Sequence, residues 1–140
     1  IVIAKSSAYF VQAFSRIGLI PDVGGTYFLP RAMGLAKAIG SSIFADKIMA
    51  AEAHEIGLIY EYVEDDNYDI HLKSRVEYLA NGPTVAFAGI KTAMRKSLNN
   101  SLDEQLELEA KLQKKCGNTR DFQEGVLAFH EKRDAKFEGR

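Results

Sequence analysis

The alternation of apolar and polar positions changes period near residue 26, which divides the chain into a short β-like beginning and a long helical remainder. Before that point, residues 1–4 and 9–13 are rich in β-branched and aromatic side chains, which predicts two short strands. A third strand is predicted over residues 58–63, where apolar and polar residues alternate again. Helical spacing in the same half predicts helices over residues 26–33, 35–45 and 51–56.

The second half of the chain shows longer helical patterns with clear apolar stripes. Pro83 suits the start of one of these helices, and Ser101 with Glu104 has the spacing of a capping box at the start of the next. A last helix is predicted over residues 120–136, with Asp121 in its first turn. The predicted fold is therefore mostly helical, with a few short strands near the beginning.

So few strands do not make a stable sheet alone, so we expect their partners in an upstream segment or in another chain. The sequence also begins without Met, directly inside an apolar run, which suggests a fragment of a longer protein. The alternative is a self-sufficient helical bundle with a small β-appendage.

Composition narrows the possible functions. With 46% hydrophobic and 26% charged residues, 140 residues suffice for one ordinary core, and a net charge of -1 gives no field for nucleic acid or an anionic membrane. No apolar run approaches the roughly 20 residues that cross a bilayer, and no secretory signal is present, so we expect a cytoplasmic protein. Cys116 stands alone and the three histidines are widely spaced, so no metal site is expected.

The turn from Pro21 to Gly25 carries the most informative polar residue, Asp22. Pro and Gly on either side make the turn rigid, and a helix is predicted to follow, so the carboxylate can be held at a fixed geometry. From the residues alone, the favoured role of Asp22 is an N-cap of that helix, which requires no catalysis.

Three motifs in order resemble those of one enzyme family. They are G-x-x-P-x-x-G-G-T followed by L-P-R over residues 18–31, A-x-E-A-x-x-x-G-L over residues 50–58, and D-F-x-E-G followed by A-F-x-E-K-R over residues 121–133. Together they resemble the C-terminal half of the enoyl-CoA hydratase/isomerase (crotonase) family. The pattern is most similar to Asp-dependent isomerases of that family, such as epoxyphenylacetyl-CoA isomerase.

The resemblance implies an incomplete α/β crotonase fold, a ClpP-like spiral of ββα turns. Residues 1–65 would form the C-terminal part of the crotonase core, and residues 66–140 a helical oligomerisation region of a homotrimer or hexamer. In the family, two backbone N–H groups from the absent half hold the thioester oxygen. The chain alone would therefore supply only part of an active site.

The resemblance also implies roles for particular residues. Family isomerases place their proton-shuttling aspartate at the position of Asp22, in an apolar pocket that would raise the pKa of a carboxylate toward the working pH. The expected lining residues of this pocket are Phe14, Leu19, Val23 and Tyr27. Phe129 and Lys132 match positions that contact the nucleotide part of CoA in a neighbouring subunit, although both also suit an ordinary apolar stripe and a solvated helix face.

The expected function is an acyl-CoA isomerase that shifts a double bond or opens an epoxide through Asp22, with an acyl-CoA substrate and no cofactor besides the CoA thioester. Phe14 occupies the position of a hydratase glutamate and cannot transfer a proton, which disfavours the first alternative, an enoyl-CoA hydratase of fatty-acid β-oxidation. A dehalogenase is disfavoured because the chain has no Trp. A non-catalytic oligomerisation fragment is the alternative from a different class.

Overall fold

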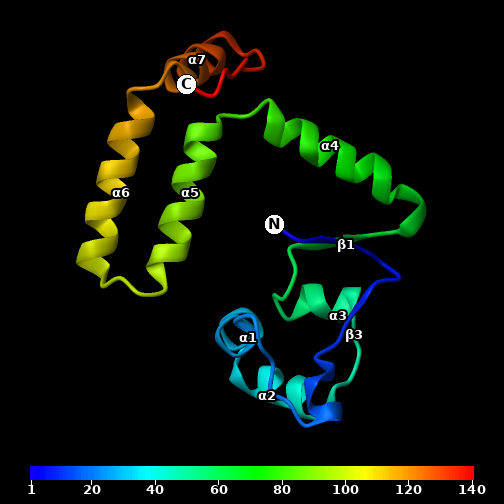
Figure 1. Ribbon diagram of the computed structural model, residues 1–140. Coiled ribbons are helices and arrows are strands. Elements are labelled where there is room, and N and C mark those ends of the chain that lie inside the picture. The colour runs from blue at the N-terminus through cyan, green and yellow to red at the C-terminus, as the bar shows by residue number, and fades with distance from the viewer. The chain divides into compact units, whose positions relative to one another are not determined.

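Helices dominate the computed structural model, which describes residues 1–140 (Figure 1). Contacts divide the chain into two compact units, residues 1–73 and residues 74–140. Helix α4 (Tyr68–Ala80) runs from the first unit into the second. The sequence predicts that residues 1–65 belong to the crotonase core and that residues 66–140 mediate oligomerisation. Both roles stay predictions.

Four short strands of the first unit form two separate pairs. Strand β1 (Ile3–Lys5) pairs in parallel with β4 (Glu61–Val63), and β2 (Tyr9–Phe10) pairs antiparallel with β3 (Ile48–Met49). The predicted strands at the beginning and over residues 58–63 are confirmed in shortened form. Strand β3 was missed because two residues are too few to show an alternation.

The prediction of a strand over residues 9–13 is wrong beyond Phe10. The chain instead forms a 3-10 helix, η1 (Ala13–Ile17), which ends at Gly18 in the left-handed region with φ 75°. Glycine adopts this conformation without a steric penalty, so the helix stops there and the chain turns toward Pro21.

The helices of the first unit confirm the predicted ones to within about one residue. They are α1 (Gly25–Met33), α2 (Leu35–Phe44) and α3 (Ala50–Glu55). Gly34, with φ 79°, separates α1 from α2 and lets the chain change direction between them. A second, very short 3-10 helix, η2 (Asp65–Asn67), precedes α4.

The core of the first unit consists mainly of small side chains. Its buried members are Ala4, Met33, Ala38, Ile48, Ala50, Ala53 and Ile59. No large side chain is fully buried, while several large apolar residues of α1 and α2 are exposed, among them Phe28, Leu35 and Phe44. Because hydrophobic stabilisation grows with the apolar area removed from water, this core stabilises the unit only modestly.

The second unit contains three further helices, α5 (Thr84–Ser97), α6 (Leu102–Gly117) and α7 (Arg120–Glu131). Helices α5 and α6 lie side by side as a hairpin (Figure 1). The predicted capping box is confirmed, because the Ser101 hydroxyl accepts the Glu104 N–H at 3.3 Å and the Glu104 carboxylate accepts the Ser101 N–H at 2.8 Å. Gln105 then donates to the Ala93 carbonyl at 3.2 Å, which links the two helices.

Helix α7 ends earlier than predicted, so the prediction of a helix to residue 136 is wrong. Lys132 takes a left-handed conformation with φ 54°, and the helix stops at Glu131. The chain then folds back toward the start of α7, where Arg133 binds the Glu124 carboxylate. We call residues 132–140 the return segment.

Candidate functional site

Asp22 lies on the turn between η1 and α1, and it is not the N-cap of α1. That position belongs to Gly24, without any side-chain hydrogen bond, so the N-cap role favoured from the residues alone is wrong. The reason is that the chain continues through two left-handed residues, Val23 and Gly24, before the helix begins. The exposed Asp22 carboxylate has no hydrogen bond or ion pair within the chain.

Backbone geometry holds this turn. The Asp22 carbonyl accepts the Gly25 N–H at 2.8 Å, and the Gly24 carbonyl accepts N–H groups of Tyr27 and Phe28 at 2.9 Å each. Val23 has φ 50°, which is sterically costly for a β-branched residue, and its side chain is 94% exposed, so no packing within the chain offsets the strain.

Gly24 has φ 82°, a conformation that glycine adopts without a steric penalty. A Cβ at this position would lie 2.9 Å from Cε2 of the Phe28 ring, which covers the turn. The site thus combines a strained residue, a left-handed glycine and a carboxylate without a partner, and strained backbone is found at functional sites more often than elsewhere.

An apolar cavity of about 400 Å³ lies beside the Asp22 turn, between η1, α1 and α2. Its lining residues are Ser15, Leu19, Ile20, Pro21, Gly25, Thr26, Leu29, Pro30, Leu35, Ala38, Ile39, Ser42 and Ile43. Leu19 is the one predicted pocket residue among them. Leu35, Ile39 and Ile43 were not predicted to line a pocket, although their spacing of four residues along a helix places them on one face and is a usable signal.

The other predicted pocket residues lie around the turn rather than in this cavity. Phe14 belongs to η1, is half-buried, and its carbonyl accepts the Leu19 N–H at 3.0 Å. Tyr27 stands on α1 with the Arg31 guanidinium 3.6 Å from its ring centroid, so a cation covers one face of the ring. Val23 points into solvent.

Phe129 and Lys132, the predicted contacts of the CoA nucleotide, both lie in the second unit at the end of α7. The Phe129 side chain is 81% exposed, and the Lys132 ammonium has no ion pair within the chain. Both groups are therefore free to meet a ligand.

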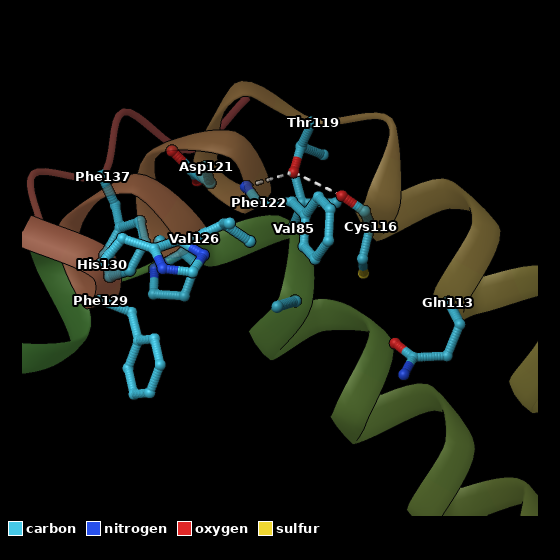
Figure 2. A pocket seen from close by; sticks show the side chains of 13 residues that line it. Val85, Gln113, Cys116, Thr119, Asp121, Phe122, Val126, Phe129, His130 and Phe137 are labelled. Atoms are coloured by element: carbon cyan, nitrogen blue, oxygen red, sulfur yellow. Dashed lines mark hydrogen bonds between the residues drawn. The ribbon is translucent and has the colours of Figure 1, made fainter.

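Phe129 also borders a cavity of about 600 Å³ in the second unit (Figure 2). Helix α7 contributes Phe122, Val126 and Phe129 to the cavity wall, and the return segment contributes Phe137. The Thr119 hydroxyl fixes the rim, because it accepts the Phe122 N–H at 3.1 Å and donates to the Cys116 carbonyl at 2.6 Å.

Two carboxylates near the start of α7, Asp121 and Glu124, were not predicted as part of any site. Asp121 is buried and accepts two backbone N–H groups of the return segment. Hydrogen bonds from Arg133 and from the Lys136 N–H lower the pKa of Glu124 to about 2, and the same pair raises the pKa of Arg133. Glu124 and Arg133 therefore stay charged near neutral pH.

No group of three or more His, Cys, Asp or Glu side chains is arranged to hold a metal ion. None of the helices combines the length and the apolar character needed to cross a bilayer.

Comparison with known proteins gives a consistent result. Residues 1–140 match the family model described as Enoyl-CoA hydratase/isomerase. The chain is 52% identical over 140 residues to a probable enoyl-CoA hydratase of Rhodobacter capsulatus, and 43% identical over 140 residues to the 1,2-epoxyphenylacetyl-CoA isomerase of Escherichia coli. All of this chain is aligned in both cases, but only 54% and 53% of the relatives, so the chain spans about half their length.

A solved structure supports the same fold. The crystal structure of an enoyl-CoA hydratase/isomerase from Cupriavidus metallidurans superimposes with a TM-score of 0.91 at 32% identity, covering 99% of this chain and 52% of that one. The predicted crotonase fold is confirmed for the part that this chain represents.

Proposed function

Because this chain belongs to the enoyl-CoA hydratase/isomerase family, we propose that the full-length protein is an acyl-CoA isomerase with Asp22 as the proton-transferring group. The observation that carries the proposal is the exposed Asp22 carboxylate without a partner, on a turn fixed by its backbone. The similarity to an isomerase of Escherichia coli, at 43% identity, supports it further.

The chemistry needs one carboxylate. Asp22 removes a proton from C2 of a β,γ-unsaturated thioester, and the electron pair moves into a dienolate with its charge on the thioester oxygen. The same carboxyl group returns the proton to C4, so the double bond moves to C2–C3 and the overall composition is unchanged. Opening of an epoxidised acyl-CoA would use the same group.

The dienolate oxygen requires hydrogen-bond donors, which we place in the part of the protein beyond this chain. The apolar cavity beside Asp22, lined by Leu19, Ile39 and Ile43, has the chemistry for an acyl group. Phe129 and Lys132 would hold the nucleotide end of a CoA thioester bound to a neighbouring subunit, since an ammonium is a point-charge partner for phosphate. No further cofactor is needed for these steps.

We also propose that the helices of residues 66–140 mediate assembly into a trimer or hexamer. Large apolar residues on them support this, because Met94 is 69% and Leu102 73% exposed. The cytoplasmic location expected from the sequence stays a prediction.

An enoyl-CoA hydratase is the second candidate, because the relative from Rhodobacter capsulatus, at 52% identity, is described as a probable hydratase. Hydration needs a base for water and an acid for carbon, usually two carboxylates. Phe14 supplies no proton, so the isomerase is favoured over the hydratase.

The test compares the full-length protein with its Asp22→Asn variant on a β,γ-enoyl-CoA. Asparagine keeps the size of the side chain but cannot accept the proton, so we expect kcat to fall by about 100-fold or more. Asp46→Asn is the matched control, because Asp46 is also an exposed aspartate of the first unit and lies in the loop after α2.

Unchanged turnover in the Asp22→Asn variant would remove the proposed role of Asp22. Hydration of an α,β-enoyl-CoA is measured in parallel with the same preparations. If the unmodified protein hydrates this substrate faster than it isomerises the β,γ-enoyl-CoA, the hydratase assignment replaces the isomerase.

A further inference from the structure

The return segment is bound to the first turn of α7 by a buried carboxylate. Asp121 is 4% exposed, and its two oxygens accept the N–H groups of Glu138 at 2.7 Å and Gly139 at 3.0 Å. The Asp121 N–H in turn donates to the Arg140 carbonyl at 3.1 Å. A buried carboxylate that is satisfied only by backbone N–H groups fixes the path of that backbone.

Glu124, three residues further along the same helix face, binds the beginning of the same segment. Its two oxygens accept the Arg133 guanidinium as a fork, at 2.6 and 3.0 Å, and one of them also accepts the Lys136 N–H at 2.7 Å. Asp121 and Glu124 thus hold both ends of the return segment, and we call them the carboxylate clamp.

One glycine allows the segment to take this path. Gly139 has φ +76°, and a Cβ there would lie 2.6 Å from the Thr84 hydroxyl oxygen. Phe137 of the return segment lines the cavity that Phe129 borders (Figure 2). The Asp and Glu of the D-F-x-E-G motif therefore both bind the return segment.

Lys132 stands at the corner between α7 and the return segment. Its left-handed conformation, φ 54°, is unfavourable for a residue with a side chain, so neighbouring contacts must hold it. On the helix side, the Lys132 N–H donates to the Phe129 carbonyl at 3.3 Å. On the other side, the next residue, Arg133, forms ion pairs with Glu124 and with Glu131. Glu124 thereby anchors the residue that directly follows Lys132.

We propose that Asp121 and Glu124 are positioning residues, which hold the return segment so that Lys132 and Phe129 are preorganised for the phosphate-bearing end of a CoA thioester. The inference rests on the proposed function only insofar as Lys132 and Phe129 meet the nucleotide end of CoA. It does not depend on which reaction the acyl group undergoes. Without the clamp, the segment and the Lys132 corner would sample many conformations, and binding would require their ordering.

The test measures binding of hexanoyl-CoA and of hexanoyl-pantetheine to the full-length protein by calorimetry. Neither saturated thioester has a double bond to move, and the second lacks the nucleotide. For Glu124→Gln and Asp121→Asn we expect the Kd of hexanoyl-CoA to rise roughly threefold to tenfold, with the Kd of hexanoyl-pantetheine unchanged. Glu107→Gln is the matched control, because Glu107 is an exposed glutamate of α6 paired only with Lys111.

Hydrogen exchange followed by mass spectrometry gives a second readout, with faster exchange expected over residues 133–140 in both clamp variants. Should Asp121→Asn fail to fold, the partly exposed Glu124→Gln still decides. An equal rise in Kd for both thioesters would show a general structural role and overturn the proposal. So would an unchanged Kd for hexanoyl-CoA, with or without faster exchange. If the clamp variants behave as expected while no isomerisation is found, only the proposed reaction fails.

Discussion

The two units support their proposed ligand-contacting residues in different ways. In the first unit, Asp22 stands on a turn held by backbone hydrogen bonds, with strained Val23 beside it and no side chain bound to its carboxylate. In the second unit, Lys132 itself has a strained conformation, but Asp121 and Glu124 hold the adjoining segment through five hydrogen bonds, three to backbone N–H groups and two to the Arg133 guanidinium. One site residue is fixed by local geometry and the other by a network of charged side chains.

The difference fits the role that we propose for each residue. A carboxylate that transfers a proton must keep its oxygens available, so side-chain partners would compete with the substrate. An ammonium that binds phosphate needs only a defined place and an unpaired charge, so a network can surround its backbone. In the second unit, substitution of the clamp carboxylates or of Gly139 should therefore loosen the return segment. In the first unit, the effect should come from substitutions that change the backbone conformation of the Asp22 turn.

The largest effect is expected for Gly139→Ala in the second unit. The substitution places a side chain at φ +76° and a Cβ 2.6 Å from the Thr84 hydroxyl oxygen. We expect the free energy of local opening of the return segment to fall by about 1–2 kcal/mol. Hydrogen exchange over residues 133–140 in the full-length protein measures this directly.

Gly117→Ala is the control for that experiment, because a Cβ at Gly117 meets no atom within 4 Å and the residue lies at the end of α6. Alanine is the better helix former, so exchange at the end of α6 should slow slightly while the return segment is unaffected. Equal exchange rates in the Gly139→Ala variant and the unmodified protein would mean that the segment is not held as described.

A smaller effect is expected from pH, because the Glu124–Arg133 pair is partly exposed and screened by solvent. The pKa of Glu124 is lowered from 4.5 to about 2 in the folded protein. Its stabilisation is therefore fully present above pH 4.5, and it is lost as pH falls from 4.5 toward 2, where the folded protein must take up a proton.

The corresponding measurement is the melting temperature of the full-length protein and of Glu124→Gln as a function of pH. The unmodified protein should melt higher near neutral pH, and the difference should shrink as pH falls below 4.5. A difference that stays constant across this range would show that the charge of Glu124 contributes nothing.

Local signals in the sequence predicted local structure well. The capping box of Ser101 and Glu104 was correct because both partners lie within one turn and compete with no distant contact. The family resemblance was confirmed, and with it the fold. The position of Asp22 was misjudged because the start of α1 depends on the φ angles of Val23 and Gly24, which residue preferences do not reveal for valine.

The end of α7 could not be predicted, because its cause is not local. The helical period continues past Glu131, whereas Arg133 reaches back to Glu124 and the Glu138 N–H reaches back to Asp121. Such pairings across nine and seventeen residues leave no periodic signal. The cavity face of α2 is different, because its spacing of four residues is a local signal that the sequence contains.

The smallest effect is expected for Val23→Gly, which tests whether backbone strain holds the Asp22 turn. Glycine removes a left-handed penalty of about 1–2 kcal/mol but costs about 0.5–1 kcal/mol through the greater freedom of the unfolded chain. The net stabilisation is then about 0.5 kcal/mol, visible as a small rise in melting temperature of the full-length protein, and no packing within the chain is lost because the side chain is 94% exposed. Val23→Ala is the control, since it keeps a Cβ in the left-handed conformation and should raise the melting temperature less than Val23→Gly does. We expect kcat on the β,γ-enoyl-CoA to fall in Val23→Gly, because a looser turn holds Asp22 less firmly. A lower melting temperature would instead mean that the Val23 side chain makes contacts outside this chain, and the turn would then be held by packing, as the return segment is held by its clamp.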